Sequence, residues 1–284
     1  MIKFNSNFRN SGGDSVSKCC TWIEDFSFTL SETVISDAEI SVSEMYLFNT
    51  QDKNPHKLLG QFFKFIHVTY KQKFAELTDE FIDSVNNKHF LTSALVGRSI
   101  IEATATLRFY NQKLIKKIHT RANKPNESWE AEVDLINESL ELAMQHMKGT
   151  NFDWEQFFTS DKKTFVDSLV EKEKARLRKE KPVKPNYIKS QPVGKYLDNW
   201  FDDEPELVSF AYNFFSELVH PNLGSNLLLT GVSKDKLQIG LNSNRAVGKT
   251  ISHHAVLTLV PVIKEASKQL ADSIFIAGAF DPID

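Results

Sequence analysis

The chain has 284 residues and a formal net charge of −3 at pH 7, and 41% of its residues are hydrophobic and 25% charged. This composition is typical of a folded soluble protein and excludes wholesale disorder, while the small net charge excludes a protein that binds nucleic acid through its overall charge. Its length predicts one large domain or two modest ones, at about 100–200 residues per domain.

No stretch of the sequence has the features of an export signal or a membrane span. The first fifteen residues lack the apolar core of about 7–15 residues that a signal peptide needs, and the longest nearly uncharged apolar stretch, residues 251–263, is shorter than the ~18 residues of a membrane span. The two cysteines, Cys19 and Cys20, are adjacent and make neither a disulfide framework nor a four-ligand zinc site. We therefore expect a cytoplasmic protein that binds no membrane, no metal and no cofactor.

Residues 1–54 differ from the rest of the chain and form a predicted N-terminal arm or small β element. Between Lys18 and Lys53 there is no lysine or arginine. Residues 26–48 alternate loosely with period two and are rich in Thr, Val, Ile and Phe, which favours short strands or an extended arm. The same region is rich in acidic residues. They form a patch that either pairs with a basic surface, on this chain or on a partner, or is a solvated edge. Its acidic residues are Glu24, Asp25, Glu32, Asp37, Glu39, Glu44 and Asp52.

From Pro55 onward, apolar residues recur at helical spacing. We predict helices over about residues 55–82, 89–119, 128–147, 162–184 (broken at Pro182), 193–201, 205–220 and 249–276. We also predict a β-hairpin with strands over residues 226–230 and 236–241 and a turn over residues 231–235. The predicted fold class is therefore mainly α, with a helical domain over residues 55–284, a small β-hairpin and a strand-like N-terminal arm.

The predicted helix over residues 89–119 contains two charges among apolar residues. It is apolar all round, which is typical of a buried central helix. Arg98 and Glu102 lie on one of its faces, one turn apart. Since an isolated buried charge costs several kcal/mol or more, both should be paired. They are either an i,i+4 ion pair that holds the helix in register or part of a functional site.

A narrow polar line runs along the helix over residues 205–220. Asn213, Ser216, Glu217 and His220 are spaced i, i+3, i+4 and i+7, so they share one face of an otherwise apolar helix. Histidine is the side chain best suited to exchange a proton near neutral pH, and the helix C-terminus favours its charged form. His220 is either such a functional group or a capping residue before Pro221.

A third candidate is the basic segment that follows residue 171. Seven basic residues within residues 171–184 stand against three acidic ones. A cluster of cations of this kind binds nucleic acid by releasing counterions. The alternative is a solvated helix with intrahelical ion pairs. The candidate RNA-contacting residues are Lys172, Lys174, Arg176, Arg178, Lys179 and Lys181.

Taken together, RSIIEATATLRFY and the later YNFFSELVHPN, followed by a hairpin and a closing helix, resemble the HEPN superfamily over about residues 55–275. More narrowly, the chain is similar to uncharacterised bacterial proteins with an RSxxE helix and a later SxxxHP helix. It implies a helical bundle that commonly forms a homodimer. It also implies a relation to RNA in toxin or phage-defence systems, where many members are metal-independent ribonucleases.

By this resemblance His220 matches the catalytic histidine, which activates the ribose 2′-hydroxyl. The family's arginine, which four to six residues separate from the histidine, has no counterpart here: residues 213–215 are Asn, Phe and Phe. Our hypothesis is that Arg98 supplies that charge and that Glu102 or Glu217 orients His220, with Asn213 on the same line. The alternative is a catalytically inactive module that binds a partner protein.

Overall fold

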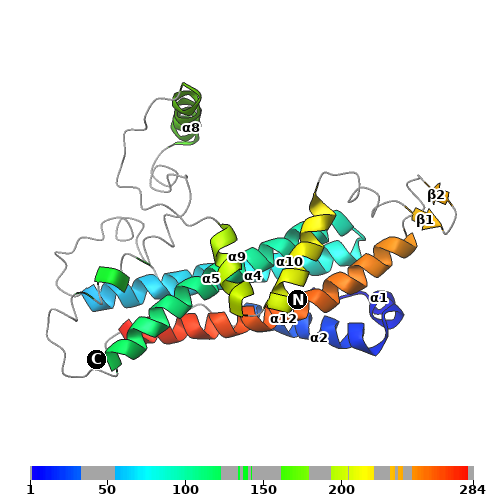
Figure 1. Ribbon diagram of the computed structural model, residues 1–284, viewed down its shortest axis with the longest axis horizontal. Helices are drawn as coiled ribbons and strands as arrows, with labels where there is room; N and C mark the ends of the chain where they lie inside the picture. The colour runs from blue at the N-terminus through cyan, green and yellow to red at the C-terminus, as the bar shows by residue number, and fades with distance from the viewer. Residues whose placement is uncertain are drawn as a thin grey trace. The chain divides into compact units, whose positions relative to one another are not determined.

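We describe the protein from a computed structural model. The structure describes residues 2–32, 55–122, 134, 137–139, 142, 161–178, 193–203, 205–220, 231–233, 236–238 and 245–280. Almost all of these residues are helical. The helices are α1 (Ser6–Ser11), α2 (Gly13–Glu32), α4 (Pro55–Asn86), α5 (Phe90–Ala122), α8 (Lys162–Leu177), α9 (Val193–Asp203), α10 (Pro205–Val219) and α12 (Arg245–Phe280) (Figure 1).

The predicted helices that begin near residues 55, 89, 162, 193, 205 and 249 are confirmed. Residues 134, 137–139 and 142 are helical as well, while the rest of the predicted helix over 128–147 lies outside the described residues. Two strands, β1 (Gly231–Ser233) and β2 (Lys236–Gln238), pair antiparallel, with Val232 opposite Leu237. Residues 236–238 belong to the predicted second strand, but the predicted turn is wrong for residues 231–233, which pair with that strand; residues 226–230 lie outside the described part. The residues between the strands and those flanking them lie outside the described part.

The expected strand-like character of the N-terminal arm is wrong for residues 26–32, because α2 runs through to Glu32. Apolar residues of α2 recur every three or four positions from Val16 to Leu30, and this face is buried. The loose period-two alternation would have placed Phe26 and Phe28 on one face, but Phe26 is buried and Phe28 is 40% exposed. Burial of the helical face overrides the local β propensity. Residues 33–54 lie outside the described part.

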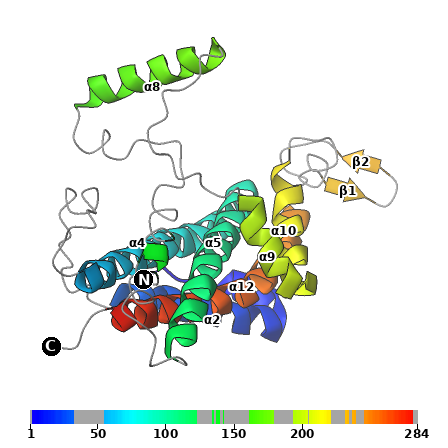
Figure 2. The same ribbon diagram turned by 60° about the vertical axis from the view of Figure 1, so that its left-hand side comes forward.

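The chain divides into two compact units. The first comprises residues within Met1–Ser36, Ile66–Gln112 and Val193–Phe275, and the second comprises residues within Asp37–Phe65, Lys113–Pro192 and Ile276–Asp284. In the first unit α2 runs beside α12, as both views show (Figure 2), and Trp22 of α2 stacks under the Lys264 ammonium of α12. Its core contains fully buried residues of α2, α4, α5, α9, α10 and α12: Ile23, Phe74, Phe81, Ile100, Leu107, Trp200, Phe215 and Leu259.

The second unit has a smaller apolar cluster. Phe63 of α4 and Phe280 of α12 pack with their ring centroids 5.3 Å apart, and both are buried. At the start of α8, Asp161 acts as the N-cap, since its Oδ1 accepts hydrogen bonds from the backbone N–H groups of Lys163 and Thr164 at 3.0 Å. The hydrogen bond that the Thr164 hydroxyl donates to Oδ2, together with these backbone bonds, lowers the pKa of Asp161. No helix in the described part of the chain has the length and low charge needed to cross a membrane.

α4 is followed by a turn in which one residue, Lys88, adopts the left-handed conformation. Lys88 has φ of 62°. Its N–H donates to the carbonyl of Val85 at 3.2 Å, and the N–H of His89 donates to the carbonyl of Ser84 at 2.8 Å. This pair of bonds is the Schellman motif, in which glycine is the favoured residue at the left-handed position.

We therefore predict that Lys88→Gly stabilises the protein by about 1 kcal/mol, since the left-handed conformation costs a residue with a Cβ roughly that much. The measurement is the midpoint of urea unfolding. Asn87→Gly, one residue earlier and outside the left-handed region, is the matched control and should not stabilise. An unchanged or lower midpoint for Lys88→Gly would contradict this account of the turn.

Candidate functional site

Arg98 and Glu102 are brought together on α5, as their spacing predicts. The Nε atom of Arg98 lies 2.9 Å from Oε1 of Glu102 and donates a hydrogen bond to it. The two side chains are 32% and 30% exposed, so the pair is at the edge of the helix packing rather than in the core. The hydrogen bond to the carboxylate raises the pKa of Arg98 above its ordinary value.

Tyr212 of α10 completes this group, and its role was not predicted from the sequence. The guanidinium of Arg98 lies over the Tyr212 ring, 5.1 Å from the centroid, and the Tyr212 hydroxyl donates to Oε1 of Glu102 at 3.3 Å. We call Arg98, Glu102 and Tyr212 the α5–α10 triad. The two helices approach closely because residue 97 is glycine: a Cβ there would lie 2.6 Å from the Phe215 ring.

The residues of the polar line on α10 differ in burial. Phe215 and Ser216 are buried, whereas Asn213, Glu217 and His220 are exposed. Asn213 donates to the hydroxyl of Ser209 at 3.4 Å, and the backbone N–H of His220 donates to the carbonyl of Ser216 at 3.0 Å. The interface that we expected to bury the polar line instead uses Tyr212. His220 follows Tyr212 by eight residues, about 12 Å along a helix axis.

The basic segment shows the intrahelical pairing that its alternative interpretation predicts. Lys172, Lys174 and Arg176 belong to α8, and Nζ of Lys174 lies 2.6 Å from Oε1 of Glu171. Arg178 follows the helix and is exposed. Lys179 and Lys181 lie outside the described residues.

A more deeply buried ion pair, which the sequence reasoning missed, joins α5 to α12. Nε of Arg108 lies 3.3 Å from Oε1 of Glu265, and their side chains are only 6% and 12% exposed. The same guanidinium contacts Asn199 of α9 at 3.5 Å and lies 5.9 Å from the ring centroid of Trp200. Three helices of the first unit therefore converge on one cation.

The signal for Arg108 was present in the sequence. It lies on the same apolar helix as Arg98, so the argument that a buried charge needs a partner applies to it equally. Its partner could not be named, because Glu265 is far away in the sequence. The contact between the buried hydroxyls of Tyr110 and Tyr196, which lie 3.0 Å apart, could not be predicted for the same reason, because the two residues are far apart in the sequence.

A serine–histidine contact between α4 and α12 has the spacing of a nucleophile and base but not their hydrogen bonding. Nδ1 of His67 lies 2.8 Å from Oγ of Ser273. The Ser273 hydroxyl donates to the carbonyl of Leu270 at 2.7 Å, so it accepts from His67 rather than donating to it. Burial and the charge of Lys71 lower the pKa of His67. The contact is therefore structural.

Comparisons of the chain with models of known protein families, with curated proteins and with solved structures find no match. Within the described ranges, no three histidine, cysteine, aspartate or glutamate side chains come together in a group that could hold a metal ion.

The two arginines of α5 give a prediction about stability. Arg108→Ala should destabilise the protein by about 3 kcal/mol, because the buried Glu265 carboxylate would keep only the exposed Lys268, 4.0 Å away, as a cationic partner. Arg98→Ala, on the same helix, removes a pair that is about one-third exposed and should lose about 1 kcal/mol or less. Urea unfolding of both variants measures the difference.

Combining Arg108→Met with Glu265→Leu separates the lost ion pair from lost packing. This double variant removes both charges and should recover most of the stability. Equal losses for the two alanine variants, or no recovery in the double variant, would contradict the assignment of Arg108 and Glu265 as a buried pair.

His67 gives a prediction about pH. The folded protein binds a proton at His67 less readily than the unfolded chain, so stability contributed by this residue should be lost as the pH falls below about 6.5. The His67→Gln variant should show a smaller decrease in unfolding midpoint between pH 7.5 and about 5.5 than the wild type. His119→Gln, which replaces an exposed histidine, is the control. An identical pH dependence of the unfolding midpoint for His67→Gln and the wild type would contradict this account of His67.

Proposed function

We propose that this chain is a HEPN-like helical binding module of a bacterial defence or stress system, which acts by binding a partner protein and not by cleaving RNA. The proposed bundle class rests on the α5 and α10 motifs, RSIIE and SELVHPN, and on the short antiparallel strand pair between α10 and α12. The mainly helical architecture of the described residues is compatible with it.

One observation favours the binding module over the enzyme. The groups of the composite ribonuclease site differ in their surroundings. Arg98 is engaged by Glu102 and Tyr212, while Asn213, Glu217 and His220 lie on the exposed side of α10. General acid–base catalysis requires about 2.6–3.2 Å between the proton-exchanging atoms, or one bridging water. The α5–α10 triad instead acts as a contact that fixes one helix against the other.

The second candidate function is a metal-independent ribonuclease with His220 as acid or base. The observation that favours it is the exposure of His220 just after the end of α10, where an RNA could reach the imidazole. In that case Arg98, or a basic residue of a second protomer, would have to supply the positive charge that the family's arginine provides.

The experiment that separates the two functions is an RNA-cleavage assay on labelled single-stranded RNA with a metal chelator present. The wild type, His220→Ala and Arg98→Ala are compared with His119→Ala, which removes an exposed histidine elsewhere. For a binding module, all four proteins leave the RNA at the level of the buffer control.

Cleavage by the wild type and by His119→Ala that is lost in His220→Ala would overturn the proposal in favour of the ribonuclease. Loss in Arg98→Ala as well would place the arginine in the same reaction, provided that the variant keeps the wild-type helical content by circular dichroism.

A further inference from the structure

Three exposed apolar side chains of the first unit surround one stretch of α12, each on a different helix. Phe210 of α10 is 63% exposed, Trp22 of α2 is 53% exposed and Leu257 of α12 is 37% exposed. In both views α12 runs between α10 and α2 (Figure 1, Figure 2). We call the surface formed by these three residues the α12 face.

The direction of α10 places Phe210 beside Leu257. The Phe214 ring contacts the His254 ring of α12 with centroids 6.4 Å apart, and Phe210 stacks on Phe214 one turn earlier. α10 runs antiparallel to α5, and α5 runs parallel to α12, as the contacts along these helices show. The turn before Phe214 therefore lies beside the turn after His254, which carries Leu257.

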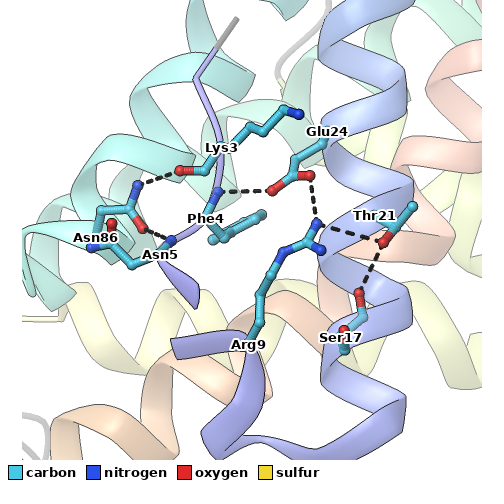
Figure 3. A network of polar contacts seen from close by, with 8 residues as sticks. All are labelled: Lys3, Phe4, Asn5, Arg9, Ser17, Thr21, Glu24 and Asn86. Carbon is cyan, nitrogen blue, oxygen red and sulfur yellow. Dashed lines mark hydrogen bonds and ion pairs between the residues drawn. The ribbon is translucent and has the colours of Figure 1, made fainter. Parts of the chain in front are cut away.

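Trp22 borders the other side of the α12 face. Its ring centroid lies 4.6 Å from Nζ of Lys264, two turns after Leu257. The opposite side of α2 is covered by the first residues of the chain, where Glu24 accepts a hydrogen bond from the N–H of Phe4 (Figure 3). Trp22 lies on the side of α2 that these residues leave exposed.

The α12 face is cationic along one side. Three exposed lysines border it: Lys18, Lys264 and Lys268. The nearest acidic residue of α12, Glu265, is bound by the buried Arg108. The nearest acidic residue of α2, Asp25, lies one turn beyond Trp22. Three lysines against one exposed carboxylate favour a partner that carries negative charge at this side.

We propose that the α12 face binds an amphipathic helix of a partner protein. Apolar residues of that helix contact Phe210, Leu257 and Trp22, and its acidic residues pair with the lysines. Helices that bind in this way present apolar anchors at positions i, i+3 or i+4, and i+7. Leu257 at the centre is less exposed than the residues on either side, so the face is recessed along α12 and fits a rod better than a flat membrane.

This inference rests on the proposed function, because it names the surface and the class of partner for the proposed binding module. Exposed apolar residues that gather around one helix and have charged residues at their rim are typical of a protein-binding surface.

The probe is a synthetic amphipathic peptide of about 20 residues, which is roughly 30 Å long as a helix. Leucines occupy every third or fourth position, and glutamates flank them. A second peptide has lysine in place of each glutamate. Each peptide carries a fluorescent label and is titrated with the full-length protein while its anisotropy is measured. We expect the acidic peptide to bind about tenfold more tightly than the basic one.

Variants of the protein locate the binding surface. Trp22→Ala and Phe210→Ala truncate side chains that are more than half exposed, and each should weaken binding of the acidic peptide about tenfold. Phe28→Ala is the matched control, because Phe28 is an exposed aromatic residue of α2 that lies a third of a turn around the helix from Trp22. It should leave binding unchanged. Circular dichroism checks that each variant keeps the wild-type helical content.

Charge reversal tests the cationic side. Lys264→Glu combined with Lys268→Glu should reverse the preference, so that the basic peptide binds more tightly than the acidic one.

Four results would overturn the inference: binding of neither peptide, equal affinity for both, an unchanged preference after charge reversal, or equal weakening by Phe28→Ala and Trp22→Ala. Binding of phosphatidylserine vesicles that is lost in Phe210→Ala and Trp22→Ala would also overturn it, because the face would then contact a membrane. The RNA-cleavage assay remains a separate test. Cleavage overturns the proposed function whether or not the peptide binds, whereas failure to bind the peptide by a protein that leaves RNA intact overturns only this inference.

Discussion

The first unit depends on one constraint: a central helix that is buried on most sides carries charges, and each charge must find a partner among the surrounding helices. α5 meets this constraint twice. Arg108 is bound by Glu265 of α12 with α9 beside it, and Arg98 is bound by Glu102 and by the ring of Tyr212 on α10. Since an unpaired buried charge is strongly destabilising, these contacts restrict how α9, α10 and α12 can pack on α5.

The same constraint bears on chemistry. An arginine that already binds a carboxylate and an aromatic face can stabilise a developing negative charge elsewhere only by giving up those contacts. The depth of the two pairs differs: Arg108 is almost completely buried, while Arg98 is about one-third exposed. Of the two arginines, Arg98 in the α5–α10 triad is therefore the one that a solute could reach, and its contacts hold α5 against α10. A role in binding another protein would leave them intact.

Much of the helical architecture was predictable because apolar residues at a spacing of three or four mark a buried helical face regardless of the partner. The spacing located α4, α5, α9, α10 and α12, and it placed Arg98 beside Glu102. It could not reveal contacts between helices: nothing local marks Tyr212, rather than the polar line at His220, as the residue that faces α5, or Glu265 as the partner of Arg108. Residues 26–32 were mispredicted because their short alternating pattern fits a strand, while the longer helical pattern from Val16 to Leu30 decides their structure.

The contacts of residues 2–11 show a second limit of such patterns. Asn86 and Glu24 bind the main-chain groups of Lys3, Phe4 and Asn5, which every sequence possesses, so only the buried Phe4 ring and Arg9 distinguish this segment from another peptide. Because any residue at these positions would offer the same N–H and carbonyl groups, no local sequence pattern marks where the segment docks.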